Sequence, residues 1–437
     1  MKLNYKRTIL IGFAFFSICA FWQFYDNEIP KILKYTFNLG ETATGVVMAL
    51  DNVLALFLLP FFGSLSDRMD TRMGKRMPFI LLGTLLSTIL LFVLITVARP
   101  SRSLPFFIIV LLLLLVAMGT YRSPAVSLMP DLTPAPFRSS ANAIINLMGT
   151  LGGIYILVMI KFLLKEAADP AQTNYIPLML SLIGIMLVAV LVVFVTIDEK
   201  KIKKKIEKEG GLHSLGETFE EGEDKASGDG KQDMPKDVKR SLLFLLLSVF
   251  LWFTAYNAVT TAFSRFVVEV WDLHDNAYAT CLLVATGAAT LSYVPIALIS
   301  GKLGRKKTIL IGICIMAASF IITGLYPHFS TSINIFFALV GIGWAAINVN
   351  SYPMVVEMSK SGDIGKFTGT YYTFSMAAQV FTPIFSGFLL EHVSYKTLFP
   401  YAFIFSALAF VTMLMVKHGD TRPDKKKTIL EHFDVDD

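Results

Sequence analysis

The stretch Gly63–Ile80, GSLSDRMDTRMGKRMPFI, lies between two apolar runs that are each long enough to cross a lipid bilayer. A shorter basic segment, Gly301–Lys307 (GKLGRKK), lies between apolar runs at the corresponding place in the second half of the chain. Membrane orientation alone would explain loose positive loops, but not the Gly-x-x-x-Asp-Arg order together with the repeat. One glycine-led basic loop in each half therefore predicts an internally duplicated protein that crosses the membrane many times.

The composition independently indicates a membrane protein. Of the 437 residues, 54% are hydrophobic and 16% are charged, and the mean hydropathy is +0.61, whereas soluble domains carry about 25% charged residues. Spanning helices need about 20 apolar residues each, and twelve such runs are found, at 8–30, 42–62, 79–98, 104–130, 140–164, 175–197, 241–266, 277–300, 308–326, 332–356, 368–390 and 397–416. Because these runs are long and uniformly apolar, they predict an all-α integral membrane protein and exclude a closed barrel of alternating strands.

The placement of positive charge predicts the orientation of the chain. Most of the 39 Lys and Arg residues lie in the two termini, the central segment and the loops that follow even-numbered spans. The positive-inside rule then places both termini in the cytoplasm of a multi-pass protein of the cell membrane. The net charge of +6 reflects this topology and attraction to the lipid bilayer, and it gives no reason to expect a nucleic-acid partner.

The domain organisation follows from a change in composition. Residues 198–240 are rich in Lys, Glu, Asp and Gly, and we expect a cytoplasmic linker of which part forms an amphipathic helix on the membrane surface. The sequence thus predicts a six-helix bundle at 1–197, a second at 241–416 and a cytoplasmic tail at 417–437. Two such bundles around a central cavity are typical of alternating-access transporters.

Several motifs carry a resemblance to known transporters. The two basic loops resemble the signature of the major facilitator superfamily, a glycine–aspartate–basic loop between the second and third helices of each half. SDRMDTRMGKRMPFI and the Asp-Leu-Thr…Arg…Ala-Asn pattern of Tyr121–Asn142 resemble plant sucrose/proton symporters, as does GDIGKFTG followed by Gln379 and Pro383. Tyr121–Asn142 also shares Pro-x-x-Ser-Leu-x-Pro with melibiose-type members of the glycoside–pentoside–hexuronide:cation symporters. The resemblance implies the major facilitator fold, twelve helices in two bundles, and secondary transport of a glycoside such as sucrose or maltose.

Charged residues inside spans are candidates for function, because each costs roughly 2.5–3.5 kcal/mol unless it is paired or hydrated. Asp51 lies twelve residues before Gly63, about 18 Å along a helix, which is near the middle of a bilayer core. Arg122 lies nine residues before Asp131, about 13 Å from the end of its run. The similar depth predicts an ion pair between Asp51 and Arg122, which either serves transport or only fixes helix packing.

The resemblance also bears on the coupling ion. Sucrose symporters carry a protonatable acid at the position of Asp131 and an arginine at that of Arg138, although Asp131 could equally end a helix or start a turn. Melibiose-type symporters carry two acids where this chain has Leu59 and Ala55, and their helix-four acid corresponds to Arg122. Because these sodium-binding carboxylates are missing, the resemblance favours proton coupling over sodium coupling.

Sugar binding calls for aromatic rings and for amide or carboxyl groups that pair with hydroxyls. The outer half of the first run is unusually polar, and amides inside spans need partners. The predicted substrate-binding residues are Trp22, Gln23, Asp26, Asn27, Glu28, Trp252, Asn257, Asn348 and Gln379.

The first basic loop is predicted to act as a conformational latch. Its candidate residues are Gly63, Asp67, Arg68, Gly74 and Arg76. We expect the Asp67 carboxylate to meet either a basic side chain or the N-terminal end of a neighbouring helix, where anions are stabilised.

The sequence analysis therefore predicts a monomeric, proton-coupled glycoside symporter in which Asp131 or Asp51 carries the proton, opposed by Arg122 and Arg138. The absence of a Gly-Lys-Ser/Thr loop argues against ATP-driven transport, and no enzymatic activity, cofactor or metal site is expected. Two alternatives remain open: an efflux antiporter of another small solute on the same fold, and a membrane sensor that does not transport.

Overall fold

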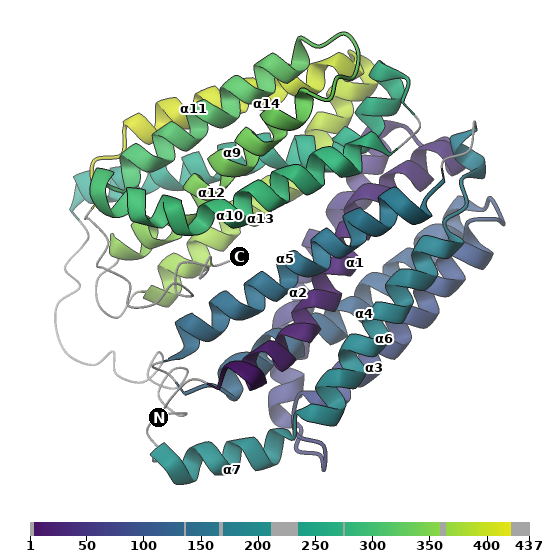
Figure 1. The fold of residues 1–437 in the computed structure, drawn as a ribbon, viewed down its shortest axis with the longest axis vertical. Coiled ribbons are helices and arrows are strands. Elements are labelled where there is room, and N and C mark those ends of the chain that lie inside the picture. The colour runs from purple at the N-terminus through teal and green to yellow at the C-terminus, as the bar shows by residue number, and fades with distance from the viewer. Residues whose placement is uncertain are drawn as a thin grey trace. The chain divides into compact units, whose positions relative to one another are not determined.

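The computed structural model describes residues 4–134, 137–165, 169–210, 235–273, 276–358 and 364–420, and these residues form almost only helices (Figure 1). Twelve of the helices are long and apolar enough to cross a membrane. The prediction of an all-α membrane protein with twelve spans is therefore confirmed. Each span satisfies its own backbone hydrogen bonds, as the bilayer interior requires.

The first compact unit comprises residues 1–40, 47–215 and 274–280. Within it, α1 packs against α5 and α6, and α3 packs against α4 and α6. The helices of this half are α1 (Tyr5–Phe37), α2 (Glu41–Arg68), α3 (Met77–Val93), α4 (Leu104–Asp131), α5 (Arg138–Leu163), α6 (Ile176–Thr196) and the short α7 (Glu199–Gly210).

The second unit comprises residues 41–46, 216–273 and 281–437. Its helices are α9 (Lys236–Trp271), α10 (Ala277–Leu303), α11 (Arg305–Gly324), α12 (Ile333–Glu357), α13 (Ile364–His392) and α14 (Leu398–Leu414). Here α9 packs against α13 and α14, and α11 packs against α12 and α14. The pairing of helices repeats that of the first unit, so the duplication seen in the basic loops extends to the packing.

The unit boundaries differ in detail from the predicted bundles. Residues 41–46, at the start of α2, group with the second unit, and residues 274–280 group with the first. The beginning of the predicted linker is helical: α7 starts three residues after α6 ends and covers Glu199–Gly210. Residues 211–234 of the linker and 421–437 of the tail lie outside the described part of the chain.

The predicted first loop is shorter than its sequence suggested. α2 continues through Gly63 to Arg68, and α3 begins at Met77, so only the eight residues between them leave the helices. The polar residues after Gly63 extend the helix beyond the apolar run, and Arg68 in its last turn opposes the negative end of the helix dipole. The motif therefore presents its aspartate on a helix.

Close helix packing in both units depends on glycines. An added Cβ at Gly152 of α5 would lie 2.0 Å from the backbone oxygen of Phe16 on α1. At Gly343 of α12 it would lie 2.6 Å from the backbone oxygen of Gly312 on α11. Small residues let these backbones approach closely where lipid gives no hydrophobic drive for association.

Candidate functional site

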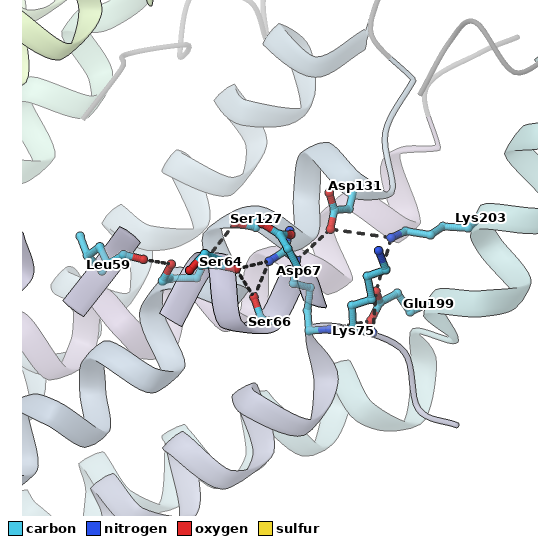
Figure 2. Close-up of polar contacts among 12 residues, drawn as sticks. Leu59, Ser64, Ser66, Asp67, Lys75, Ser127, Asp131, Glu199 and Lys203 are labelled. Atoms are coloured by element: carbon cyan, nitrogen blue, oxygen red, sulfur yellow. Dashed lines mark hydrogen bonds and ion pairs between the residues drawn. The ribbon is translucent and has the colours of Figure 1, made fainter. Parts of the chain in front are cut away.

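Polar residues of α2, α3, α4 and α7 meet at one end of the first unit (Figure 2). Arg76, at the start of α3, is only 5% exposed. Its Nε donates to Asp131 Oδ2 at 2.9 Å, and its two Nη atoms donate to Asp67, to Ser66 and to the backbone oxygen of Gly63. We call the residues Gly63, Ser66, Asp67, Arg76, Asp131, Glu199 and Lys203 the basic-loop cluster. A planar guanidinium with five N–H donors suits this many acceptors in a fixed geometry.

α7 completes the basic-loop cluster through a buried acid. The Glu199 carboxylate, with the residue 1% exposed, accepts from the backbone N–H of Lys75 at 3.0 Å and of Arg76 at 3.1 Å. Carboxylates are stabilised where helix N–H groups lack partners. Gly74 adopts φ +109°, and an added Cβ would lie 2.1 Å from Glu199 Oε2. Glycine at this position thus permits both the turn and the approach of α7.

Lys203 joins α7 to the end of α4. Its Nζ lies 3.5 Å from Glu199 Oε1 and 3.8 Å from Asp131 Oδ2, and Figure 2 shows it pointing from α7 toward Asp131. The cluster therefore ties four helices together by alternating charges. The expectation that Asp67 meets a basic side chain is confirmed, whereas Arg68 is exposed and lies outside the cluster.

Asp131 thus belongs to the basic-loop cluster, with Arg76 and Lys203 as its cationic partners. Its predicted partner, Arg138, is the first residue of α5, and that side chain lies outside the described part of the structure. The pairing of these two residues consequently stays a prediction.

A second group of charges lies far from the helix ends, on α1, α2 and α4. The Arg122 guanidinium carbon lies 5.6 Å from the centre of the Trp22 ring, a cation–π distance. The carboxylates of Asp26 and Asp51 interact electrostatically with Arg122. All four side chains are half-buried. We call Trp22, Asp26, Asp51 and Arg122 the central charge cluster.

The predicted direct ion pair within the central charge cluster is not formed. Across the described ranges, no contact within 4.0 Å joins Arg122 to Asp51, whose Oδ1 accepts from the backbone N–H and the Nδ2 of Asn52 at 2.6 and 2.7 Å. Asp26 is a further acid that interacts electrostatically with Arg122. It makes no hydrogen bond or ion pair to another described residue. The buried Nε1 of Trp22 and the buried hydroxyl of Tyr25 also lack hydrogen-bond partners there. The cluster therefore holds donors and acceptors that the described protein groups leave unused.

Of the other predicted residues of α1, Asn27 and Glu28 are buried in protein, whereas Gln23 is half-buried. Asn27 is 1% exposed, and its Nδ2 donates to the backbone oxygen of Gln23 at 2.8 Å. Glu28 is fully buried, accepts a hydrogen bond from the Tyr278 hydroxyl and lies 3.6 Å from Lys31 Nζ. These contacts make Glu28 part of a closed polar group in this conformation.

The predicted residues of the second unit lie on α9, α12 and α13. Trp252 has no exposed surface and Asn348 is 8% exposed, while Asn257 and Gln379 are half-buried. Nearby in the sequence, Tyr256 stacks on Trp344, with ring centroids 3.8 Å apart and an interplanar angle of 5°.

The second basic loop contains a counterpart of the basic-loop cluster that sequence reasoning missed. Arg305, the first residue of α11, pairs with Glu357 at the end of α12. Asp420, which follows α14, accepts from the backbone N–H of Lys306 at 2.8 Å, and Gly304 adopts φ +94°. The signal that could have revealed this was present in both halves: an acid placed shortly after the last span, at Glu199 and at Asp420.

The chain thus has two sets of six spans, and in each set an acid that follows the last span holds the basic loop. This is the architecture of a polytopic membrane protein built from two related halves. A sequence profile of the Major Facilitator Superfamily matches residues 11–292 and 245–433. The chain belongs to this superfamily, and the predicted fold is confirmed.

Solved structures share this fold at low sequence identity. The nucleoside transporter NupG is 15% identical with a TM-score of 0.66, covering 95% of this chain and 100% of that chain. The inward-open xylose transporter XylE from E. coli is 16% identical with a TM-score of 0.65, covering 98% of both chains. A POT family transporter bound to 5-aminolevulinic acid is 12% identical with a TM-score of 0.69, covering 94% of this chain and 95% of that chain. No curated protein matches the sequence.

Proposed function

We propose that the protein is a proton-coupled symporter that carries a glycoside such as sucrose or maltose across the cell membrane by alternating access. The observation that carries the proposal is the central charge cluster. It offers an acid, a guanidinium and an indole N–H that make no hydrogen bond to another described residue, well inside three spans. Sugar hydroxyls both donate and accept hydrogen bonds, so they can bridge such groups. The likeness to a xylose transporter supports a sugar but does not identify one.

The cluster also suggests how sugar and proton are coupled. With Asp26 and Asp51 both ionised, two negative charges face the one positive charge of Arg122 inside the membrane. If sugar hydroxyls bind the Arg122 guanidinium, its positive charge stabilises the two carboxylates less. Protonation of one of these acids is then favoured. Binding of sugar and binding of a proton then become linked, as symport requires.

Among the acids, we place the coupled proton at Asp51 or Asp26 in preference to Asp131. Asp131 already has Arg76 at 2.9 Å and Lys203 at 3.8 Å, so its charge is compensated without a substrate. We assign Asp131, with Gly63, Asp67, Gly74 and Arg76, to the conformational latch. The latch end of the spans, with both termini, would face the cytoplasm, and the unit of transport would be the monomer.

The test is uptake of labelled sucrose, maltose and xylose into proteoliposomes, driven only by a pH gradient. We expect uphill accumulation that a protonophore abolishes. Asp51→Asn and Asp26→Asn replace each acid by an amide that stays neutral, like the protonated carboxyl. These variants should lose accumulation but retain sugar exchange between equal concentrations on the two sides of the membrane. Glu28→Gln removes a buried acid of the same helix α1 from a closed polar group, so it should retain coupling to pH and serves as the matched control.

Two outcomes would overturn the proposal. If neither Asp51→Asn nor Asp26→Asn reduces accumulation, the central charge cluster does not carry the proton. If loaded vesicles instead expel solute when the gradient is reversed and never accumulate sugar, the protein is an efflux antiporter. Binding without any flux would indicate the sensor alternative.

A further inference from the structure

We propose that α7 is a docking surface for the headgroups of anionic phospholipids, and that it holds them on the face opposite to the basic-loop cluster. The two faces of α7 differ sharply. Glu199 and Ile206 are 1% and 4% exposed, and together with the half-buried Ile202 and Lys203 they form the face that packs against the unit. These positions recur at the spacing of one helix face.

The opposite face of α7 carries Lys201, Lys204 and Lys205, which are all exposed. Lys201 is 86% exposed, although its Nζ lies 2.9 Å from Asp198 Oδ2. Residues 198–210 hold six lysines against four acids. Glu199 faces the unit and Asp198 pairs with Lys201. The described outer face therefore carries Lys201, Lys204 and Lys205 against Asp198 and has a surplus of positive charge.

The position of α7 supplies the second argument. It begins three residues after α6 ends, and the last turn of α6 exposes Phe194 by 41% and Val195 by 72%. Large exposed apolar side chains at the end of a membrane span mark its contact with lipid tails, so the next residues lie at the headgroup level. Figure 1 shows α7 turned away from the direction of α6 at this end of the unit.

These observations favour lipid over a soluble anion. The lysines follow one another along a helix at the level of the headgroups instead of converging on one point, so they suit several phosphodiesters of a surface. Docking by Glu199 and Lys203 keeps the lysine face turned outward. A basic segment at the membrane surface gains about fivefold in binding for each lysine near anionic lipid.

The experiment uses the full-length protein in detergent, titrated with phosphatidylglycerol or phosphatidylcholine, with bound lipids counted by native mass spectrometry. We expect preferential retention of phosphatidylglycerol. The triple variant Lys201→Gln, Lys204→Gln, Lys205→Gln should reduce that preference more than about tenfold. Lysine-to-arginine changes at the same three positions should preserve it.

The matched control changes three other exposed lysines at helix ends, Lys165→Gln, Lys302→Gln and Lys396→Gln, and should leave the preference unchanged. Equal loss in the control and the α7 variant would overturn the proposal, as would no loss in either. A third arm adds inorganic phosphate at the headgroup concentration. If phosphate displaces the lipid, the site binds a soluble anion and the proposal of a lipid surface is wrong. None of these outcomes depends on which solute the protein transports.

Discussion

The first and second basic loops contain the same kinds of residue, but the arginine of the first loop makes more hydrogen bonds and ion pairs than that of the second. Each has a glycine with positive φ, an arginine at the start of the third helix of its half, and an acid that follows the last span. The Arg76 guanidinium donates to two carboxylates, a hydroxyl and a backbone oxygen. Within the described residues, the Arg305 guanidinium donates to Glu357 only.

The difference suggests which features belong to the duplicated scaffold and which belong to the latch. The capping acid and the arginine–acid pair occur twice, so the fold uses them to fix the third helix of each half. The additional bonds of Arg76 to Asp67 and Ser66 occur on the first side, where α7 also docks. The first loop is therefore the one whose rupture we expect to matter for the transport cycle.

The largest contrast is expected between the two arginines. Arg76→Gln leaves Asp131 and Asp67 without their main cation, and removing one partner of a buried pair costs about 3–5 kcal/mol, less here because Asp67 is more than half exposed. Arg305→Gln removes one partly exposed pair, worth about 1 kcal/mol. Turnover in proteoliposomes and thermal unfolding in detergent measure both. Equal losses in the two variants would show that the loops are equivalent.

A smaller contrast is expected between the glycines. Gly74→Ala and Gly304→Ala both force a side chain into a positive-φ conformation, at about 1–3 kcal/mol. At Gly74 the new Cβ would also meet Glu199 Oε2 at 2.1 Å, whereas at Gly304 the nearest carboxylate oxygen is 3.1 Å away. Gly74→Ala should therefore lower the unfolding temperature more. The reverse order would mean that Glu199 is not held in place.

The capping acids should differ less. Loss of a helix cap costs about 0.5–2 kcal/mol, and Glu199→Gln should lie at the upper end because Glu199 is buried and also faces Lys203. Asp420→Asn should cost less, since Asp420 is exposed. Thermal unfolding of each variant is compared with that of Lys203→Met, which removes the ion pairs of Lys203 with Glu199 and Asp131 but leaves the cap in place. If Lys203→Met equals Glu199→Gln, the backbone cap contributes nothing measurable.

The smallest effect is expected at Asp70, which pairs with Lys200 at 2.9 Å on the exposed side of the first loop. Lys200 holds the pKa of this carboxyl below its ordinary range, which is about 3.9. The pair is therefore present above that range and is lost only as the pH falls through the lowered value. Asp70→Asn should therefore lower the unfolding temperature only slightly, and by the same amount across about pH 5 to pH 8, because Asp groups do not titrate in that window. A pH-dependent shift in that window would show a stronger role.

The twelve spans, the duplication and the basic loops could be predicted from the sequence, and the latch residues predicted from it, Gly63 to Arg76, lie in one continuous stretch. The prediction that the first loop begins at Gly63 was wrong, because the polar residues Ser64–Arg68 continue α2. The partners of Asp131 were also missed, since Arg76 lies 55 residues and Lys203 lies 72 residues away along the chain.

A span is determined locally, because about 20 consecutive apolar residues must bury their own backbone hydrogen bonds in lipid. The amino-acid sequence by itself therefore determined the class of this protein and the number of its spans. Only the tertiary structure decided which side chains meet: that Asp26 joins Asp51 and Arg122, and that Glu199 caps the start of α3. The physical reason is that apolar residues surround most of each span, so the pattern of hydrophobicity does not fix its rotation. The partners then depend on close packing between helices distant in the chain.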